Sequence, residues 1–340
     1  MINKIQIGFI VRKEASEVEL STLCSLPGVS GDEYEVHQYL FREYQQLNLD
    51  LKKDKLGSIF GERQVENSPF KVMISSNIDE CGGMIDDIHE SGLLSFVTIG
   101  DVLPKDFLHQ RVCLLTRHHQ RVYGYILQKQ EKFWIHIGAK SQQEVEEFGV
   151  QVGDTFVLEI PVIETEQMIL SKNISNRAGV YAAYQLMETM SSLPYTLSIG
   201  GIAQSIVGYR GAITATNTIL PDVSIVLDVA PVRDYAEQTV YIRYFDKTLL
   251  PNVSLVKEIK TVAQSLGYEV KANVQEKGTD GSFIHKSLVG TPTVVVVIPL
   301  KEEGEFIQLL NKEDLKPVIH TLLENLTLQK VQQLAFQESW

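Results

Sequence analysis

The chain has 340 residues, more than one ordinary domain needs, so one large core with an insert, or two domains, is expected. Hydrophobic residues make up 44% and charged residues 22%, which is ordinary for a folded globular protein. The net charge of −12 gives no sign of a nucleic acid or an anionic membrane as a partner. The cysteines Cys24, Cys81 and Cys113 are scattered without a CxxC pair, which is typical of core residues in a reducing compartment. No apolar run is long enough to span a membrane, and the N-terminal stretch lacks a small-residue cleavage site, so we expect a cytoplasmic protein.

Helices and strands alternate at both ends of the chain, which predicts a mostly parallel sheet flanked by helices. In the first segment we expect an edge strand at 5–11, helices at 16–26 and 32–46, and strands at 49–53, 58–62 and 70–74. In the second we expect helices at 180–190, 213–218, 254–266 and 315–328, a short helix opened by residues 278–281, and strands at 196–203, 223–227 and 294–298. The last of these strands is all β-branched and is predicted to be buried on both faces.

Between these segments the pattern changes to short β-like runs. They fall at residues 93–98, 112–117, 122–128, 133–137 and 155–159, with one helix at 141–148. Closely spaced short strands indicate a small barrel-like domain. We therefore predict a discontinuous α/β domain of residues 1–86 and 161–340, with a β-rich domain inserted at 87–160.

Polar side chains follow several of the predicted strands directly. Asn77 and Asp79 come after the strand at 70–74 and before an expected turn at residues 81–83, and Ser205 follows the strand at 196–203. Asp228 ends the strand at 223–227, and the acidic pair 302–303, which on its own is typical of a solvated turn, follows the strand at 294–298. Sites in open α/β sheets are built beyond the carboxyl ends of strands, so these groups are the candidates for a common site.

Several short motifs, in this order and spacing, resemble one peptidase family. They are PGVSGDE at 27–33, DKLGS at 54–58, DE-x-G-x-M-I at 79–85, IHIGAKSQQEVEEFGVQVGD at 135–154, NRAG at 176–179, Q-x-x-VGYRGA at 204–212, PD…D at 221–228 and GTDGSFIH at 278–285. Over nearly all of residues 19–328 the chain resembles the glutamyl or deblocking aminopeptidases, co-catalytic metallopeptidases that include large tetrahedral assemblies and some members named endoglucanases. The resemblance implies a zinc-exopeptidase-like sheet with an inserted PDZ-like domain, removal of N-terminal residues from peptides, and two zinc or cobalt ions.

The resemblance also implies five metal-binding side chains and a glutamate general base, and most of these are replaced. Asp228 keeps a ligand position, and Asp79 keeps the position of the carboxylate that orients the first ligand. Glu303 is the carboxylate nearest to the last ligand position. The lost positions are Asn77 (first ligand), Ser175 (bridging carboxylate), Ser205 (general base), Ile206 (ligand) and, at about this point, Gly304 (last ligand).

These replacements argue against the usual reaction on chemical grounds. Ile206 has no lone pair, and the neutral Asn77 and Ser175 are poor zinc ligands. A hydroxyl at Ser205 cannot take a proton from water near neutral pH as a glutamate does. We therefore expect no bound cofactor, or at most one weakly held divalent metal.

Three hypotheses remain from the sequence. The first is a non-catalytic family member with a structural, regulatory or peptide-binding role. The second is an active aminopeptidase or other hydrolase with a rebuilt single-metal site around Asp79, Asp228 and Glu303. The third is a glycan-directed hydrolase that uses two carboxylates as acid and base. In each case we expect a homo-oligomer, from a dimer up to a dodecamer by resemblance, with a peptide ligand or an active paralogue as a possible partner and neither nucleic acid nor membrane.

Other candidate residues carry less weight. His118 and His119 are adjacent, and adjacent residues on a strand point to opposite faces, so a shared metal is not expected. His136 and His285 are interpreted as structural. No Gly-x-Ser-x-Gly elbow surrounds Ser205, so a serine hydrolase is not predicted.

Overall fold

The structure, a computed structural model, describes residues 18–327 except 69, 191–192 and 305. The edge strand predicted at 5–11 lies outside these residues. No helix in the described part is long and apolar enough to cross a membrane.

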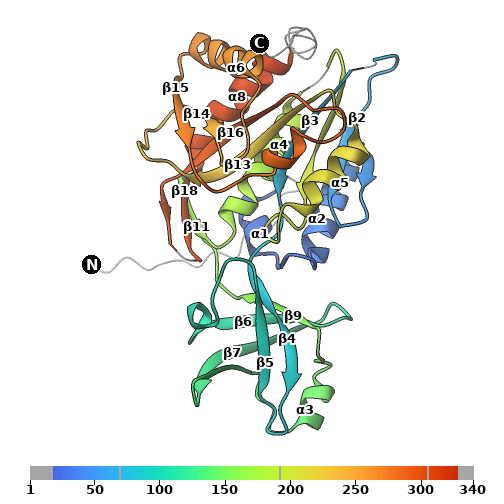
Figure 1. Cartoon of the computed structure of the whole chain (residues 1–340), viewed down its shortest axis with the longest axis vertical. Coiled ribbons are helices and arrows are strands. Elements are labelled where there is room, and N and C mark those ends of the chain that lie inside the picture. Colours follow the sequence, from blue (N-terminus) through green and yellow to red (C-terminus); the bar gives the residue numbers. More distant parts are fainter. Residues whose placement is uncertain (1–17, 69, 191–192, 305, 328–340) are drawn as a thin grey trace, which may run out of the picture.

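An eight-stranded mixed sheet forms the centre of the larger part of the molecule (Figure 1). Its strands, in spatial order, are β1 (Asp50–Lys53), β2 (Ile59–Arg63), β12 (Thr196–Ile202), β3 (Lys71–Asn77), β13 (Val223–Pro231), β16 (Thr293–Leu300), β14 (Thr239–Phe245) and β15 (Glu269–Val274). The four central strands β12, β3, β13 and β16 run parallel, so their carboxyl ends meet at one edge. The predicted mixed, mostly parallel sheet is confirmed.

Helices cover both faces of this sheet. One face carries α1 (Leu20–Ser25), α2 (Tyr34–Gln46), α4 (Ala178–Thr189), α6 (Val253–Ser265) and α8 (Leu315–Thr327), and the other carries α5 (Arg210–Ile219) and α7 (Gly281–Ile284). Strand β16 joins the two cores because Val294 and Val296 face the first and Val295 and Val297 the second. All its residues are buried, as its β-branched sequence predicts.

A closed six-stranded barrel forms the smaller part, drawn below the sheet in Figure 1. Its strands are β4 (Gly82–Ile88), β5 (Leu94–Ile99), β8 (Lys132–His136), β7 (Arg121–Lys129), β6 (Arg111–Leu115) and β9 (Thr155–Leu158), accompanied by η1 (Pro104–Phe107) and α3 (Gln142–Glu147). Phe96, Phe107 and Phe156 pack edge to face in its core. The predicted barrel is confirmed, whereas residues 87–160 as the limits of a separate domain remain a prediction.

The turn predicted at residues 81–83 is wrong, because Gly82 and Gly83 lie in β4. A Cβ at Gly82 would lie 2.2 Å from the carbonyl oxygen of Phe156, and one at Gly83 would lie 2.4 Å from the Phe156 ring. These glycines therefore serve a close approach between barrel strands and not a turn.

Several strands are not predicted by the sequence analysis. Strand β15 is a mostly exposed edge strand with charged residues, and β14 carries the buried Arg243 among its apolar residues. A small second sheet consists of β10 (Ile163–Glu164), β11 (Met168–Ser171), β18 (Gln308–Asn311) and β17 (Glu302–Glu303). The acidic pair 302–303, interpreted as a turn, is therefore a short strand. The remaining short helices are η2 (Ile174–Asn176) and η3 (Lys312–Asp314).

Candidate functional site

A pocket of about 400 Å³ lies at the carboxyl ends of the central parallel strands. The ends of β3 and β13, the loop after β12, η2 and the loop before α7 contribute to its wall, as do the β17–β18 hairpin and the barrel residues Asp101, Val102 and Leu158. This is the edge at which the order of strands predicts a site.

Most of the site positions predicted from sequence meet in this pocket. The residues that line it are Asn77, Ser175, Ser205, Ile206, Asp228 and Glu303. Asp79 and Gly304 do not line it. Gly304 lies in the turn of the β17–β18 hairpin, where its N–H donates to the carbonyl oxygen of Ile307 at 2.8 Å. The resemblance therefore identified a real convergence of side chains, while their roles remain predictions.

Ser175, at the bridging position, belongs to a network of hydroxyl and amide groups that ends at the carboxylate of Glu303. Its Oγ donates to the side chain of Asn176 and accepts from Nε2 of Gln308 at 2.9 Å. The Gln308 amide also accepts from the backbone N–H of Ser175 at 2.8 Å and donates to Glu303 at 3.2 Å. The position that needs the greatest negative charge in a two-metal site therefore carries a hydroxyl group.

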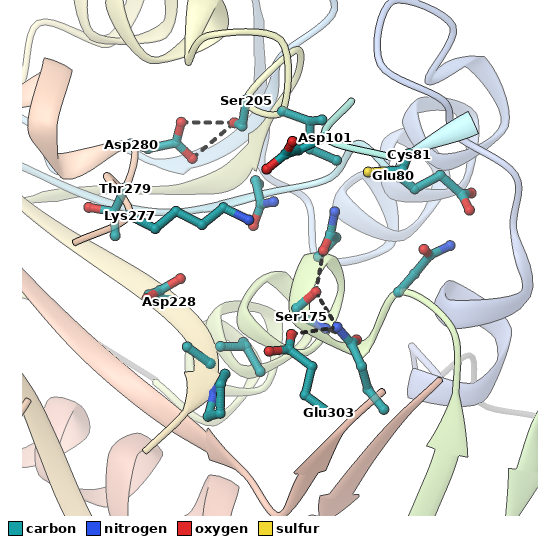
Figure 2. A pocket seen from close by; sticks show the side chains of 18 of the residues that line it. Glu80, Cys81, Asp101, Ser175, Ser205, Asp228, Lys277, Thr279, Asp280 and Glu303 are labelled. Atoms are coloured by element: carbon teal, nitrogen blue, oxygen red, sulfur yellow. Dashed lines mark hydrogen bonds between the residues drawn. The ribbon is translucent and has the colours of Figure 1, made fainter. Parts of the chain in front are cut away.

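Ser205, at the general-base position, is hydrogen-bonded to a buried carboxyl group. Its Oγ lies 2.8 and 3.0 Å from the two carboxyl oxygens of Asp280, and both residues are almost fully buried (Figure 2). Loss of solvent is the main cause that raises the pKa of Asp280 to about 8, and the nearby Asp79 and Asp228 raise it further. Asp280 is thus predominantly neutral at pH 7, and the hydroxyl group of Ser205 is already hydrogen-bonded to it.

Asp280 makes the stability of the fold depend on pH. Between its ordinary pKa of 3.8 and its folded-state pKa of about 8, the folded chain holds a proton that the unfolded chain has lost. This contribution is complete below the unfolded value and is lost as pH rises through the folded value. We expect the free energy of unfolding to fall with rising pH in this window, by up to about 1.4 kcal/mol per pH unit from this group.

Asp280→Asn is expected to remove this part of the slope, measured by urea unfolding at a series of pH values. The exposed Asp101, at the same pocket, offers a control, since Asp101→Asn is expected to leave the slope unchanged. Equal slopes for the wild type and Asp280→Asn would show that Asp280 does not hold this proton.

Asp79 is buried beneath the pocket and holds the loop that follows β12. It has no exposed surface, and its Oδ2 accepts the backbone N–H of Ile206 at 2.8 Å. Burial raises the pKa of its carboxyl group. Its position therefore suits the orientation of a neighbouring segment and not direct contact with a ligand.

Asp228, at the kept ligand position, lies within β13 and not after it, because the strand continues to Pro231. Its carboxylate forms an ion pair with Arg243, which has no exposed surface and also donates to Asn273. Part of its acceptor capacity is therefore used by a cation of the chain itself.

Three residues of this region were missed from the sequence: Arg243, Lys277 and Asp280. Arg243 lies in a strand that was not predicted, and the role of Asp280 depends on a partner 75 residues away. Lys277 lies directly before the GTDG segment, and Figure 2 shows its side chain extending across the pocket between Asp280 and Asp228. A charged residue next to a glycine at the start of a helix was the only signal for it.

The histidine candidates lie elsewhere. The ring of His119 stacks on Tyr34 at 3.6 Å between centroids, Nδ1 of His136 accepts the N–H of Gly138, and Nδ1 of His285 lies 2.9 Å from the carbonyl oxygen of Gly281. Among the described residues, no group of three or more His, Cys, Asp or Glu side chains is placed to hold a metal ion.

Comparison with known proteins identifies the family. The family model "M42 glutamyl aminopeptidase" matches residues 57–320. The chain is 32% identical to FrvX of Escherichia coli (strain K12), over 92% of this chain and 96% of that protein. A TET aminopeptidase from a marine sediment archaeon of the Thaumarchaeota superposes with a TM-score of 0.84 at 26% identity, covering 93% of this chain and 96% of that one.

A second solved structure, the TET1 peptidase of Pyrococcus horikoshii, shares the fold with a TM-score of 0.81 at 21% identity and covers 91% of this chain and 98% of its own. That peptidase can assemble into a tetrahedron or a large octahedral shell. The family model covers most of this chain, and FrvX aligns along nearly its full length. The chain therefore belongs to the M42 glutamyl aminopeptidase family.

Proposed function

We propose that this protein is a non-catalytic M42 member that binds a peptide in the pocket and does not hydrolyse it with co-catalytic metal ions. The observation that carries the proposal is the chemistry of the groups at the pocket. The bridging position is a serine hydrogen-bonded to amide groups, the base position is a serine hydrogen-bonded to Asp280, and one ligand position is Ile206. This donor set does not fit two dications, which need bridging carboxylate charge when they lie close together.

The pocket still suits a peptide. Its volume of about 400 Å³ is in the range of pockets that enclose small ligands. Amide and hydroxyl groups of Asn77, Ser175 and Gln308 lie beside the apolar Ile206 and Phe306, a mixture that can bind both the backbone and the side chains of a peptide. We further propose a homo-oligomer, by analogy with the assemblies of the TET1 peptidase, with an active paralogue as the alternative partner.

The single-metal alternative has less support. It needs Asp79, Asp228 and Glu303 together, but Asp79 is buried away from the pocket and bonds Ile206, while Asp228 is paired with Arg243. The glycan-hydrolase alternative rests on the same carboxylates, and none of the observed contacts favours it.

The test combines binding with turnover. We expect unblocked peptides, from dipeptides to decapeptides, to be recovered intact by mass spectrometry after incubation with the protein and added zinc or cobalt. We expect some of them to raise the melting temperature, since a ligand at about one hundred times its Kd stabilises by about 2.7 kcal/mol.

Two variants locate the binding. Val102 lines the pocket and Val97 is exposed on the same barrel outside it, so Val102→Trp is expected to abolish the stabilisation and Val97→Trp to keep it. Peptide cleavage that stops in the presence of a chelator would contradict the proposal in favour of the single-metal enzyme.

A further inference from the structure

Lys277 places a positive charge inside the pocket. The residue is exposed, precedes α7, and lines both the main pocket and a second, adjoining one. Figure 2 shows its side chain running across the cavity, with Ser205 and Asp280 on one side and Asp228 on the other. In the part of the chain that the structure describes, the ammonium group has no hydrogen-bond or ion-pair partner.

The other cations at this place are already paired. Lys172 also lines the pocket, but it is buried and its Nζ lies 3.0 Å from Glu80. Arg243 is buried and paired with Asp228. Burial raises the pKa of Cys81, which also lines the pocket, to about 11. The positive charge of Lys277 opposes this rise more than any other charge does, as expected for a cation inside the site. Lys277 is therefore the cation that is available to a ligand.

The same pocket carries carboxylate oxygens that can accept from a ligand. Figure 2 shows Glu303 on the side opposite to Lys277, where it is exposed and accepts one hydrogen bond from Gln308. Asp228 retains lone pairs beyond the one given to Arg243. The pocket therefore combines a cation, Lys277, with a carboxylate, Glu303, that lies on the side away from it.

We propose that Lys277 binds the C-terminal carboxylate of a short peptide whose α-ammonium group is bound by Glu303 on the opposite side of the pocket. A zwitterion suits this arrangement better than an anion such as phosphate, because Asp101, Asp228 and Glu303 would repel a ligand with net negative charge. The inference rests on the proposed peptide-binding function and adds to it the recognition of a free carboxyl end.

The experiment is a binding cycle with the complete Xaa-Ala and Ala-Xaa dipeptide series. The tightest binder is titrated by calorimetry in three forms: unblocked, C-terminally amidated and N-acetylated. With the wild type we expect amidation to weaken binding about tenfold or more, as for loss of a charge-assisted hydrogen bond. With Lys277→Met we expect the unblocked and amidated forms to bind equally, while acetylation still weakens binding.

Two further variants complete the cycle. Lys277→Arg is expected to keep the preference for the free carboxylate. Lys247 lines only the adjoining pocket, so Lys247→Met is the matched control and is expected to behave as the wild type. A preference for the carboxylate that survives in Lys277→Met would overturn the inference.

The outcomes separate this inference from the function on which it rests. Binding of longer peptides alone, with no dipeptide bound, would overturn the role of Lys277 and leave the proposed function standing. Absence of binding by every peptide length would overturn both.

Discussion

Replacing Arg177 with Met is expected to lower the free energy of unfolding by about 3–5 kcal/mol, the usual result of removing one partner from a buried charge network. Arg177 has no exposed surface, and its guanidinium donates to the backbone carbonyl groups of Leu23 at 3.2 Å and of Ile78. It also lies 3.8 Å from Glu80, which in turn accepts the N–H of Gly28 at 2.9 Å.

The loss is large because these acceptors have no water to replace the guanidinium. Arg177 joins α1, the end of β3 and the start of α4, so it fixes the segments beneath the pocket. Burial lowers its pKa, and the charge of Glu80 acts in the opposite direction. Without Arg177, Glu80 would keep Lys172 as a cationic partner but would lose part of the positive charge that balances its buried carboxylate.

Arg121→Met provides the control for Arg177→Met. Arg121 forms a partly exposed ion pair with Glu35, and such pairs contribute about 1 kcal/mol or less. Both variants are measured by urea unfolding, followed by far-UV circular dichroism at one protein concentration. If Arg177→Met and Arg121→Met lowered the free energy of unfolding equally, the buried contacts of Arg177 would not stabilise the fold more than an exposed ion pair does.

Restoring the metal side chains that the family resemblance implies is expected to create saturable zinc binding, whereas we expect none in the wild type. The common changes are Asn77→His, Ser175→Asp, Ser205→Glu and Ile206→Glu, at positions that line the pocket. The last ligand distinguishes two variants. Glu303→His is expected to give tighter binding than Gly304→His, because Glu303 lines the pocket and Gly304 lies in the hairpin turn.

Lys277 gives this experiment an additional arm. Its ammonium charge lies in the same pocket and repels a dication, so adding Lys277→Met to the restored variant is expected to strengthen zinc binding about tenfold. Lys277→Met alone is the control and is expected to bind no zinc. A restored variant that folds but binds no zinc in any version would show that the site positions are assigned wrongly.

The sequence predicted which strand ends meet at the pocket, because strand ends follow from local patterns. The buried strand that ends at Asn77 and the β-branched run of β16 were recognised from composition, and parallel strands bring their carboxyl ends together whatever the loops do. The short barrel strands were recognised in the same way, from their spacing.

The contacts within the site could not be predicted, because they join distant parts of the chain. Nothing near Ser205 in sequence indicates its bond to Asp280, and nothing near Asp228 indicates Arg243. Asp79 was expected beside a metal ligand, but it is bonded to the N–H of Ile206. Glycines 82 and 83 suggested a turn in the sequence. The residue that packs closely against them, Phe156, comes from another barrel strand, so the local sequence does not reveal this contact.

We propose that the pocket does not hold the co-catalytic metal ions that the family resemblance implies. The most direct test is the wild-type arm of the zinc titration, preceded by elemental analysis of protein purified without chelator. Metal far below one equivalent per chain, with no saturable binding of zinc or cobalt, is the predicted result. One or two tightly bound equivalents would contradict the account and would favour an active metallopeptidase.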